Sequence, residues 1–496
     1  MLIKGSTKWQ KTAEVLVVGY GAAGAAAAIA AQDEGAEVAI IEKQQAESHI
    51  SNSHTSAGFF ISPSNVKDAE EFLQYLCSAG EGISWTDQDV IKAWAEYAAE
   101  NKGWMESLGA KLRHTDRKEL SNIPGNDSID QYIVSGGGIG FMQALCQRVA
   151  SLGIPIIYGT QATKLLTNSA GEVVGVRVKQ DNGTEANIRS HRAVILTCGG
   201  FEFNENMKLQ YLKVYPTYFC GSPANTGDGI KMALDVGAEL WHMNCCPARF
   251  VAKFPDFPVA FTMDFGGRGW SHDTEKSGFE TRAGYIVVDR QGKRYTNENY
   301  RPHLLYYELT MYDNKLLQYP RVPSYWIFDR RRLESGPLPT LAAGPSGRAS
   351  LYKWSQDNQS ELRKGWLLKA DGIPDLARLM ETDSDVLCKT VENYNSLCRY
   401  GHDPEFGREA NTLVPLDQPP FFAVKLYPGG PSTQGGPRRN RKAQLVNVDG
   451  EPIPRLYGAG ELGSIYGMFY ISGLHLAECI AFGRIAGRHA ARENLP

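Results

Sequence analysis

Long apolar runs are missing from this sequence: nowhere do about 18 apolar residues follow one another, so we expect no membrane-spanning helix. Its nine cysteines include no CxxC pair, and we interpret them as reduced thiols rather than disulfides or a metal site. The net charge of −3 favours neither nucleic acid nor an anionic membrane as a partner. No apolar stretch typical of a signal peptide precedes residue 13, so we expect a cytoplasmic protein.

The composition is that of an ordinary globular enzyme. Of the 496 residues, 42% are hydrophobic and 22% are charged. A chain of this length allows roughly two to four domains. The 51 glycines predict many tight turns and close backbone approaches.

Residues 13–43 carry the strongest local signal: a β-branched run, a glycine-rich turn, an alanine-rich helical stretch and a second apolar run. In the turn, Gly19 permits the tight bend, Gly21 leaves space for a pyrophosphate and Gly24 lets helix and strand pack closely. The N-terminus of the helix offers N–H groups to the anion. Glu42 ends the second run, where it is placed to accept hydrogen bonds from an adenosine ribose. The pattern predicts a dinucleotide-binding βαβ unit.

The polar segment 50–61, "ISNSHTSAGFFI", bears on the choice between NAD and FAD. Its hydroxyl and amide side chains can bond phosphate and ribityl oxygens, and Gly58 permits close approach to a flat ring. An ordinary surface loop can have the same composition. Together with the βαβ unit, the segment favours FAD.

Several stretches along most of the chain resemble one known family. They are 52–58 ("NSHTSAG"), 136–178, 192–204 ("RAVILTCGGFEFN"), 225–240 ("NTGDGIKMALDVGAEL"), 292–298 ("GKRYTNE"), 432–436 ("STQGG") and 453–467 ("IPRLYGAGELGSIYG"). The sequence is similar to flavoproteins of the fumarate reductase/succinate dehydrogenase superfamily, and the branch of 3-ketosteroid dehydrogenases is nearest. This set of motifs is far more specific than any one of them.

The resemblance implies an α/β architecture: a Rossmann-like FAD-binding domain with an inserted α+β domain that caps the substrate. We expect the FAD-binding domain at residues 1–245 and 418–496 and the cap at 246–417. Within the cap, residues 284–289 are typical of a strand and 383–398 of an amphipathic helix.

The resemblance also implies non-covalent FAD. Relatives with covalent FAD attach it through a histidine, and here Asn52 takes that position, with His54 two residues away. We expect Glu461 to bond the ribityl chain and Asp228 to support the fold of the FAD domain. The expected FAD-binding residues are Gly19, Gly21, Ala22, Ala23, Gly24, Glu42, Lys43, Asn52, Ser53, Ser56, Ala57, Gly58, Ala162, Gly199, Gly200, Asp228, Gly460, Glu461, Ser472 and Leu474.

In this superfamily a hydride moves between flavin N5 and a substrate carbon, while the protein handles a proton and binds the oxygen where charge develops. Fumarate reductases bind their dicarboxylate with a histidine and an arginine in a C-terminal motif. In this sequence the histidine is replaced by Tyr466 and the arginine by Tyr470. Because a phenol cannot replace a bidentate guanidinium, the sequence disfavours a C4 dicarboxylate.

Tyr470-x-x-Gly473 instead resembles the ketosteroid dehydrogenases, in which a tyrosine hydroxyl and a glycine N–H hold the substrate ketone. Ser472 matches a serine of the Δ4-(5α) branch and is placed to assist. The helical stretch that follows brings a helix N-terminus close, which favours an enolate. Tyr466 fits an active-site role and a packing role equally well.

The proton handler is expected near residues 294–303. Family members carry a tyrosine or an arginine there, three or four residues after a glutamate. Tyr300 follows Glu298 by two residues and Arg301 by three, and this one-residue slip leaves the assignment open. We favour Tyr300 as the base that takes the α-proton, with Arg301 lowering its pKa, and we keep Arg301 as the alternative. Further candidates, each more typical of packing, are Tyr132, Tyr306, Tyr307 and Tyr312.

The sequence therefore predicts an FAD-dependent α,β-dehydrogenase of a cyclic ketone, either a 3-ketosteroid or a smaller alicyclic ketone such as an oxo-cyclohexane carboxylate. Electrons would pass to a quinone or a redox protein. The alternatives are an enone or enoate reductase and a non-catalytic flavin electron carrier. Arginines of the cap keep an acidic substrate open: Arg249, Arg268, Arg282 and Arg301.

Overall fold

The computed structural model describes residues 7–115, 122–266, 283–299, 303 and 305–495. The chain forms two compact units. The first contains the chain up to Leu212, Ser222–Cys246 and the part from Ser432 onward; the second contains Lys213–Gly221 and Pro247–Pro431. The second unit thus reaches further along the chain than the cap we expect from the sequence, because β19 (Phe421–Gly430) pairs with β14 (Arg249–Ala252) and β17 (Ser324–Asp329). Its role as a substrate cap stays a prediction.

An eight-stranded sheet forms the centre of the first unit. Its order is β21-β22-β11-β1-β2-β8, and β10 pairs with β11 and β9. The strands are β1 (Lys11–Val18), β2 (Val38–Ile41), β8 (Ile156–Ile157), β9 (Thr160–Thr167), β10 (Val173–Gln180), β11 (Glu185–Leu196), β21 (Gln444–Val446) and β22 (Pro452–Gly458). Strand β1 runs parallel to both β11 and β2, and its last four residues are at most 4% exposed. Such continuous apolar runs suit parallel strands covered on both faces.

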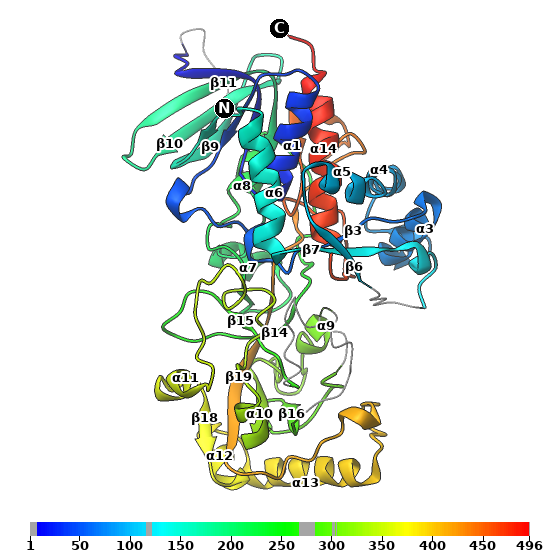
Figure 1. The fold of residues 1–496 in the computed structure, drawn as a ribbon, viewed down its shortest axis with the longest axis vertical. Helices are drawn as coiled ribbons and strands as arrows, with labels where there is room; N and C mark the ends of the chain where they lie inside the picture. The colour runs from blue at the N-terminus through cyan, green and yellow to red at the C-terminus, as the bar shows by residue number, and fades with distance from the viewer. Residues whose placement is uncertain (1–6, 116–121, 267–282, 300–302, 304, 496) are drawn as a thin grey trace. The chain divides into compact units, whose positions relative to one another are not determined.

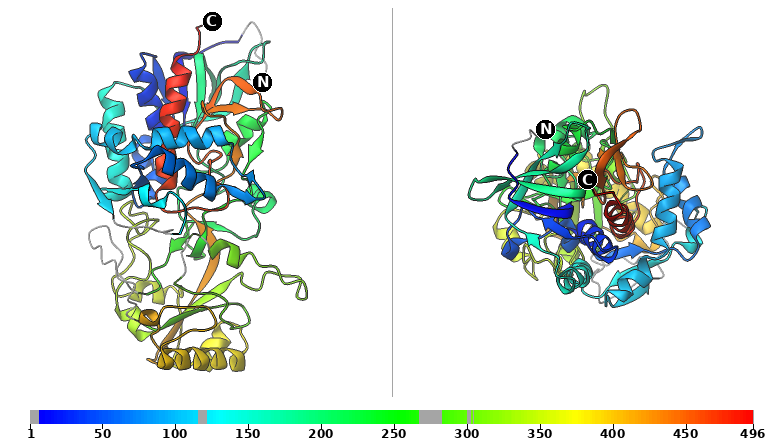
Figure 2. Two further views of the ribbon diagram at one scale, coloured as in Figure 1. Left: turned by 90° about the vertical axis from the view of Figure 1, so that its right-hand side faces the viewer. Right: turned by 90° about the horizontal axis from the view of Figure 1, so that it is seen from above.

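Two helices of the first unit, α1 (Ala22–Asp33) and α14 (Leu474–Ala491), lie side by side (Figures 1 and 2). The contact is close: a Cβ on Gly483 would lie 2.7 Å from the Ala23 carbonyl oxygen, and one on Gly487 would lie 2.2 Å from that of Ala27. Since residue numbers rise together along both helices, they run parallel. Helix α14 begins nine residues before Gly483, so its N-terminus extends roughly 13 Å beyond that of α1.

Helices from the middle of the first unit bury α14 further. Arg484 on α14 donates to Asn101 Oδ1 at 2.9 Å and to Glu100 Oε2 at 2.7 Å. The remaining helices of the first unit are α2 (Asn52–Thr55), α3 (Val66–Leu76), α4 (Gln88–Ala98), α5 (Asn101–Ser107), α6 (Gly137–Ser151), α7 (Glu205–Tyr211) and α8 (Asp228–Leu234). Short strands complete the unit: β3 (Phe59–Ile61), β4 (Ser78–Gly80), β5 (Ile83–Ser84), β6 (Leu112–Thr115), β7 (Gln131–Val134), β13 (Leu240–Trp241) and β20 (Gly436–Pro437).

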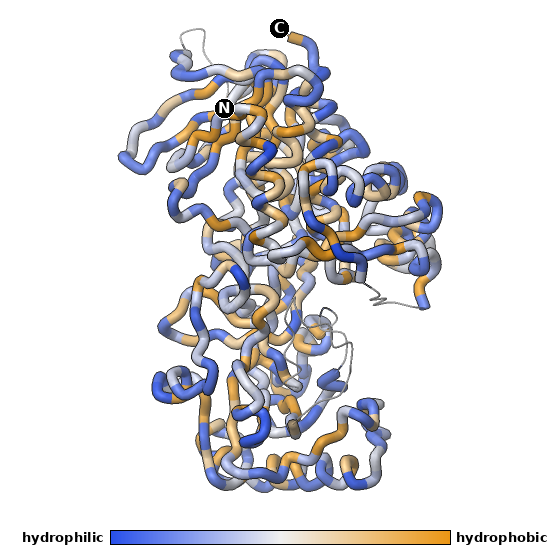
Figure 3. Tube along the Cα trace, in the orientation of Figure 1, coloured by the Kyte–Doolittle hydropathy of each residue, from blue (hydrophilic) through white to orange (hydrophobic). Residues whose placement is uncertain are grey.

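A seven-stranded sheet organises the second unit, with β19 at its centre. Its remaining strands are β12 (Tyr218–Phe219), β15 (Phe261–Thr262), β16 (Tyr285–Val288) and β18 (Leu368–Ala370). The helices are α9 (Leu305–Leu309), α10 (Arg330–Glu334), α11 (Gln359–Arg363), α12 (Ile373–Leu379) and α13 (Ser384–Tyr400). Polar and apolar residues alternate along α13 (Figure 3), and Leu387, Val391 and Tyr394 are its buried residues. The strand and the amphipathic helix predicted here are confirmed.

None of the helices that the structure describes is both long enough and apolar enough to cross a membrane.

We expect Gly487→Ala to lower the free energy of unfolding by roughly 1–3 kcal/mol, because its Cβ would overlap the Ala27 carbonyl oxygen and push α14 away from α1. Chemical denaturation measures this loss. Gly103→Ala in α5 is the matched control, since no atom lies within 4 Å of a Cβ there. Equal stability of the two variants would contradict the packing described here.

Candidate functional site

The turn between β1 and α1 is held by contacts that exclude side chains. Gly19 has a φ of +105°, and a Cβ on it would lie 2.5 Å from the Thr197 carbonyl oxygen. A Cβ on Gly24 would lie 2.0 Å from the carbonyl oxygen of Gly19. Gly21 differs, because the nearest atom to its Cβ would be in Ser51 at 3.7 Å. A Cβ on Gly21 would therefore make only ordinary van der Waals contacts with the protein.

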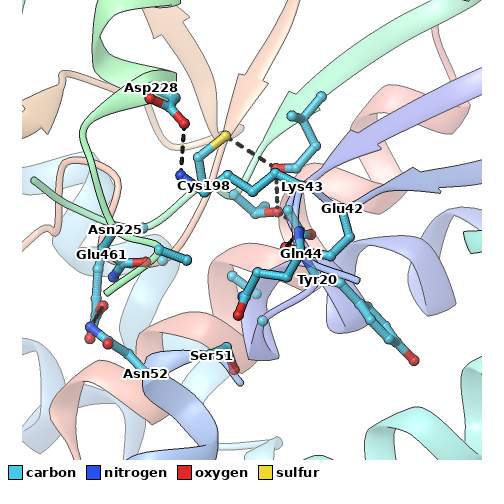
Figure 4. Close-up of a pocket in the computed structure, with 18 of the residues that line it drawn as sticks. Tyr20, Glu42, Lys43, Gln44, Ser51, Asn52, Cys198, Asn225, Asp228 and Glu461 are labelled. Carbon is cyan, nitrogen blue, oxygen red and sulfur yellow. Dashed lines mark hydrogen bonds and ion pairs between the residues drawn. The ribbon is translucent and has the colours of Figure 1, made fainter. Parts of the chain in front are cut away.

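Gly21 is one of the residues that line a cleft in the first unit (Figure 4). The residues around it include Val18 and Ile41, which end β1 and β2, together with Thr197 and Ala459, which follow β11 and β22. The cleft thus lies at the carboxyl ends of four parallel strands, where α/β sheets bind their ligands.

The N-terminus of α1 lies in this cleft. Gly21 is the N-cap residue, and no side chain caps the helix through it. Ser53 Oγ accepts a hydrogen bond from the Ala22 N–H at 3.2 Å. The first N–H groups of a helix have no partner within the helix, and they carry the positive end of its dipole. This end of the cleft suits a phosphate.

Glu42 lies beside the helix N-terminus at the end of β2. Its carboxylate accepts the Tyr20 N–H at 2.9 Å and the Gln44 N–H at 2.8 Å. Two backbone donors from opposite sides fix the carboxylate, which is 6% exposed over the whole residue. The position matches that expected for a ribose-binding acid.

Lys43 and Asp228 lie next to each other in the wall of the cleft (Figure 4). Lys43 Nζ lies 2.8 Å from Asp228 Oδ2, and Gln161 Nε2 donates to the same oxygen at 3.1 Å. Burial raises the pKa of Asp228, but Lys43 lowers it more strongly together with these hydrogen bonds, so the net pKa falls below its ordinary value. The pair ties β2 to the start of α8, which supports the structural role expected for Asp228.

Asn52 and Glu461 form the opposite wall. Asn52 Nδ2 donates to Glu461 Oε2 at 2.9 Å, and Asn52 Oδ1 accepts the Ser222 N–H at 2.6 Å. Asn52 therefore holds a fixed orientation. Burial, with the nearby Glu202 carboxyl, raises the pKa of Glu461 to about 8.

Many residues expected from the sequence line this cleft, and some do not. Those on it are Gly19, Gly21, Ala22, Ala23, Glu42, Lys43, Asn52, Ser53, Ala162, Gly199, Asp228, Gly460 and Glu461. Those outside its lining are Gly24, Ser56, Ala57, Gly58, Gly200, Ser472 and Leu474. Lining residues that sequence reasoning missed are Val18, Tyr20, Ile41, Gln44, Ser51, Thr160, Gln161, Thr197, Cys198, Ala224, Asn225, Ala459 and Cys479. Most of these adjoin a predicted residue, so widening each motif by one or two positions would have found them.

Gly58 lies against the start of α6. A Cβ on Gly58 would lie 2.4 Å from the backbone of Gly137 in this helix. Ser56 supports the same contact, because its carbonyl accepts the Gly138 N–H at 3.1 Å. The expected approach of Gly58 to the flavin ring stays a prediction.

The C-terminal motif leads into α14. Tyr466 is fully buried, and its hydroxyl donates to the Leu474 carbonyl at 2.9 Å, which gives it a packing role. The ring of Tyr470 lies 4.4 Å from that of His475. Gly473 is the N-cap of α14, with a φ of +95°. Ser472 accepts a hydrogen bond through its carbonyl from Gln131 at 2.6 Å.

His475 was not anticipated from the sequence. Its Nδ1 lies 3.1 Å from Ser432 Oγ and 3.6 Å from Glu461 Oε1. Burial lowers the pKa of His475 to about 3, so the ring is neutral at physiological pH. It therefore brings no positive charge to Tyr470.

Part of the predicted site lies outside the described residues, namely Tyr300, Arg301, Arg268 and Arg282. Glu298 lies two residues before Tyr300. Its carboxylate accepts a hydrogen bond from Arg294 Nε at 2.8 Å and lies 3.3 Å from Arg408 Nη1. Burial raises the pKa of Glu298, but the two arginines lower it by more than burial raises it. The pKa of Glu298 therefore lies below its ordinary value. This ion cluster is buried within the second unit.

Other candidates from the sequence are spread over both units. Tyr306 is buried in α9, Tyr312 is 46% exposed, and Tyr132 packs on Phe60 at 5.9 Å. Tyr307 lies in the same helix as Tyr306 and lies under Lys213 Nζ at 5.1 Å. In the second unit, Arg249 Nη2 lies 3.5 Å from His303 Nε2. No group of three or more metal-ligating side chains occurs among the described residues.

The cleft fits FAD. Gly21 in its lining and the helix N–H groups suit the pyrophosphate, and Glu42 suits the ribose. Comparison with known proteins agrees: the model of the FAD binding domain family matches residues 14–473. The chain belongs to this FAD-binding family.

Several proteins that are similar to this chain are oxidoreductases. Digoxin reductase of Eggerthella lenta is 27% identical, over 97% of this chain and 88% of that protein. A fumarate reductase (cytochrome) of Shewanella frigidimarina is 28% identical, over 97% and 77%. The structure of 3-ketosteroid delta1-dehydrogenase from Sterolibacterium denitrificans has a TM-score of 0.81 at 21% identity, covering 97% of this chain and 100% of that one, and shows the shared fold.

These findings confirm the predicted flavoprotein superfamily, the Rossmann-like α/β fold, the FAD cofactor and an FAD-dependent oxidoreductase acting on CH–CH groups. They argue against a non-catalytic electron carrier. The attachment of FAD stays a prediction: His54 Nδ1 accepts the Ser51 N–H at 3.1 Å, which agrees with a role in the loop.

Gly21→Ala tests the phosphate end of the cleft. Its φ of −91° suits alanine, so the variant should fold, but the new methyl group would occupy space that FAD needs. We expect FAD binding to weaken by roughly 1–3 kcal/mol, as measured by fluorescence titration. Gly24→Ala is the contrasting variant, because its Cβ would overlap Gly19 and should disrupt folding itself. Unchanged FAD affinity in Gly21→Ala would contradict this placement.

Proposed function

We propose that this protein is an FAD-dependent dehydrogenase that introduces a C=C bond next to the carbonyl of a cyclic ketone, either a 3-ketosteroid or a smaller alicyclic ketone. The observation that carries this proposal is the absence of positive charge at the C-terminal motif. Tyr466 and Tyr470 are phenols, and His475 beside Tyr470 is neutral because burial lowers its pKa to about 3. A dicarboxylate needs cations at such a place, whereas a ketone needs hydrogen-bond donors.

Each residue of the motif then has a distinct task. The Tyr470 hydroxyl and the Gly473 N–H would donate hydrogen bonds to the ketone oxygen. The N-terminus of α14 would stabilise the negative charge that develops on this oxygen. His475 packs against the Tyr470 ring and would hold it in place. Bound FAD supplies the acceptor for the two electrons and the β-hydrogen that leave the substrate.

The α-proton would leave to Tyr300 or Arg301. A tyrosine beside an arginine has its phenolate favoured by the adjacent positive charge, so we prefer Tyr300 as base. Glu298, two residues before Tyr300, is held in place by its ion pairs with Arg294 and Arg408. The electrons would then pass to a quinone or a redox protein.

The second candidate is a reductase that acts on an enone or enoate with electrons from a partner. The relatives named digoxin reductase and fumarate reductase favour this direction. Both candidate functions remain compatible with a keto acid as substrate, because the second unit contains Arg249, a cation that would bind a carboxylate, with His303 as its neighbour.

Redox dyes of opposite state decide between the two directions. The purified FAD enzyme is mixed without oxygen with the same ketone and enone pair, once with an oxidised dye and once with a reduced viologen. A dehydrogenase should turn over with the oxidised dye and the saturated ketone. Turnover with the reduced viologen alone would replace our proposal by the reductase.

Tyr470→Phe tests the assigned ketone donor. Loss of one such donor should lower kcat by on the order of 10²–10³-fold, while the flavin spectrum shows that FAD stays bound. Tyr466→Phe is the matched control, because its hydroxyl bonds the Leu474 carbonyl inside the fold. That variant should lose roughly 1 kcal/mol of stability and far less turnover. A Tyr470→Phe enzyme with near wild-type kcat would remove Tyr470 from the mechanism.

A further inference from the structure

Two buried carboxyl groups lie on either side of the short segment Ser432–Thr433. Glu202 Oε1 accepts the Thr433 N–H at 2.8 Å, and the residue is 0% exposed. Glu461 lines the cleft, with 14% of its side chain exposed. It reaches the same segment through His475, which contacts both Glu461 Oε1 and Ser432 Oγ. The sequence gives no hint of this pairing, because the two acids are far apart in the chain.

The cations closest to these acids are already paired with other groups. Arg439 forms an ion pair with Glu478 at 3.1 Å, and Lys43 forms one with Asp228 at 2.8 Å. Glu478 lies on α14 and adds a further acid beside Glu461, while His475 is neutral. Within the described part of the first unit, Glu461 thus faces Asn52, Glu202, Glu478 and His475, and no cation that could neutralise a second negative charge.

Polar atoms around the acids are left without partners. Glu202 Oε2, His475 Nε2 and both polar side-chain atoms of Gln434 are buried and make no hydrogen bond within the described chain. Buried polar atoms are normally satisfied, so such a group indicates that water, a proton or the cofactor completes the bonding here.

Two carboxyl groups in such a place do not both ionise easily. Burial raises the pKa of Glu202 to about 7, and burial with the Glu202 charge raises that of Glu461 to about 8. Like charges that share a site keep one of the two groups protonated. The two carboxyl groups therefore gain or lose protons close to neutral pH. A new negative charge nearby raises their pKa values and favours binding of a proton.

We propose that Glu202 and Glu461 form a proton-binding site that takes up one proton from solvent when FAD is reduced and returns it when FAD is reoxidised. Hydride transfer from a substrate would bring two electrons and one hydrogen nucleus to bound FAD, and would add one negative charge to the site next to Glu461. A proton on the acid pair offsets this charge. When an acceptor removes the electrons, the charge disappears and the proton returns to solvent.

The consequence is a steeper pH dependence of the FAD midpoint potential. One extra proton for two electrons adds about 30 mV per pH unit to the slope. This inference rests on FAD binding and not on the identity of the ketone, so its failure would leave the proposed substrate class untouched.

The test is a dye-coupled reductive titration of the holoenzyme between pH 6 and 9 without substrate. The extra slope appears only where the pair is ionised in the oxidised enzyme, above the pKa values of about 7 for Glu202 and about 8 for Glu461. Between about pH 7.5 and 9 we expect the wild-type slope to exceed that of Glu461→Gln and of Glu202→Gln by about 30 mV per pH unit. Glu202→Gln keeps the test open if Glu461→Gln loses FAD, because Glu202 is not among the residues that line the cleft. Glu451→Gln, an exposed acid, is the control and should keep the wild-type slope.

A second readout identifies the groups directly. The infrared difference spectrum between oxidised and reduced holoenzyme at pH 7.5 should contain a new carboxylic acid C=O band in wild type and lose it in Glu202→Gln. Equal potential slopes in wild type and both variants, or an unchanged infrared band, would overturn the proposal.

Discussion

The backbone contacts at the turn between β1 and α1 are the constraint on which the first unit depends. Gly24 lies against the Gly19 carbonyl so closely that no side chain fits between them. This contact brings the N-terminus of α1 to the carboxyl ends of the parallel strands, where Gly21 leaves room for a pyrophosphate. The small residues between α1 and α14 let the two parallel helices pack closely. The N-terminus of α14 extends beyond that of α1, and His475 there lies 3.6 Å from Glu461 of the cleft.

We propose that charge, rather than shape, distinguishes this site from one for a dicarboxylate. The phosphate end of the cleft uses helix N–H groups and holds its lysine in an ion pair with Asp228. Tyr470 lies against a neutral His475, and the buried Arg439 is already paired with Glu478. We propose that such surroundings suit a neutral ketone better than additional negative charge. The same shortage of cations makes proton uptake by the acid pair a natural response to reduction of FAD.

Sequence reasoning predicted the parts of the structure that depend on local patterns. Strands β1 and β2, helix α1 and most of the cleft follow from glycine spacing and apolar runs, because those features act within a few residues. The same reasoning missed Glu202 and His475, whose roles arise from contacts between distant segments. It also missed the contact of Gly58 with α6, since a glycine indicates close approach but not the partner. Tyr300 and Arg301 lie outside the described residues, so their roles stay predictions.

The central claim is that the site accepts a cyclic ketone instead of a dicarboxylate, and anaerobic flavin reduction tests it most directly. The oxidised FAD enzyme is mixed with a panel of 3-ketosteroids, cyclohexanones, oxo-cyclohexane carboxylates and succinate, and the flavin absorbance is followed. The account predicts rapid bleaching by at least one cyclic ketone and none by succinate. Bleaching by succinate, with no response to any cyclic ketone, would contradict it.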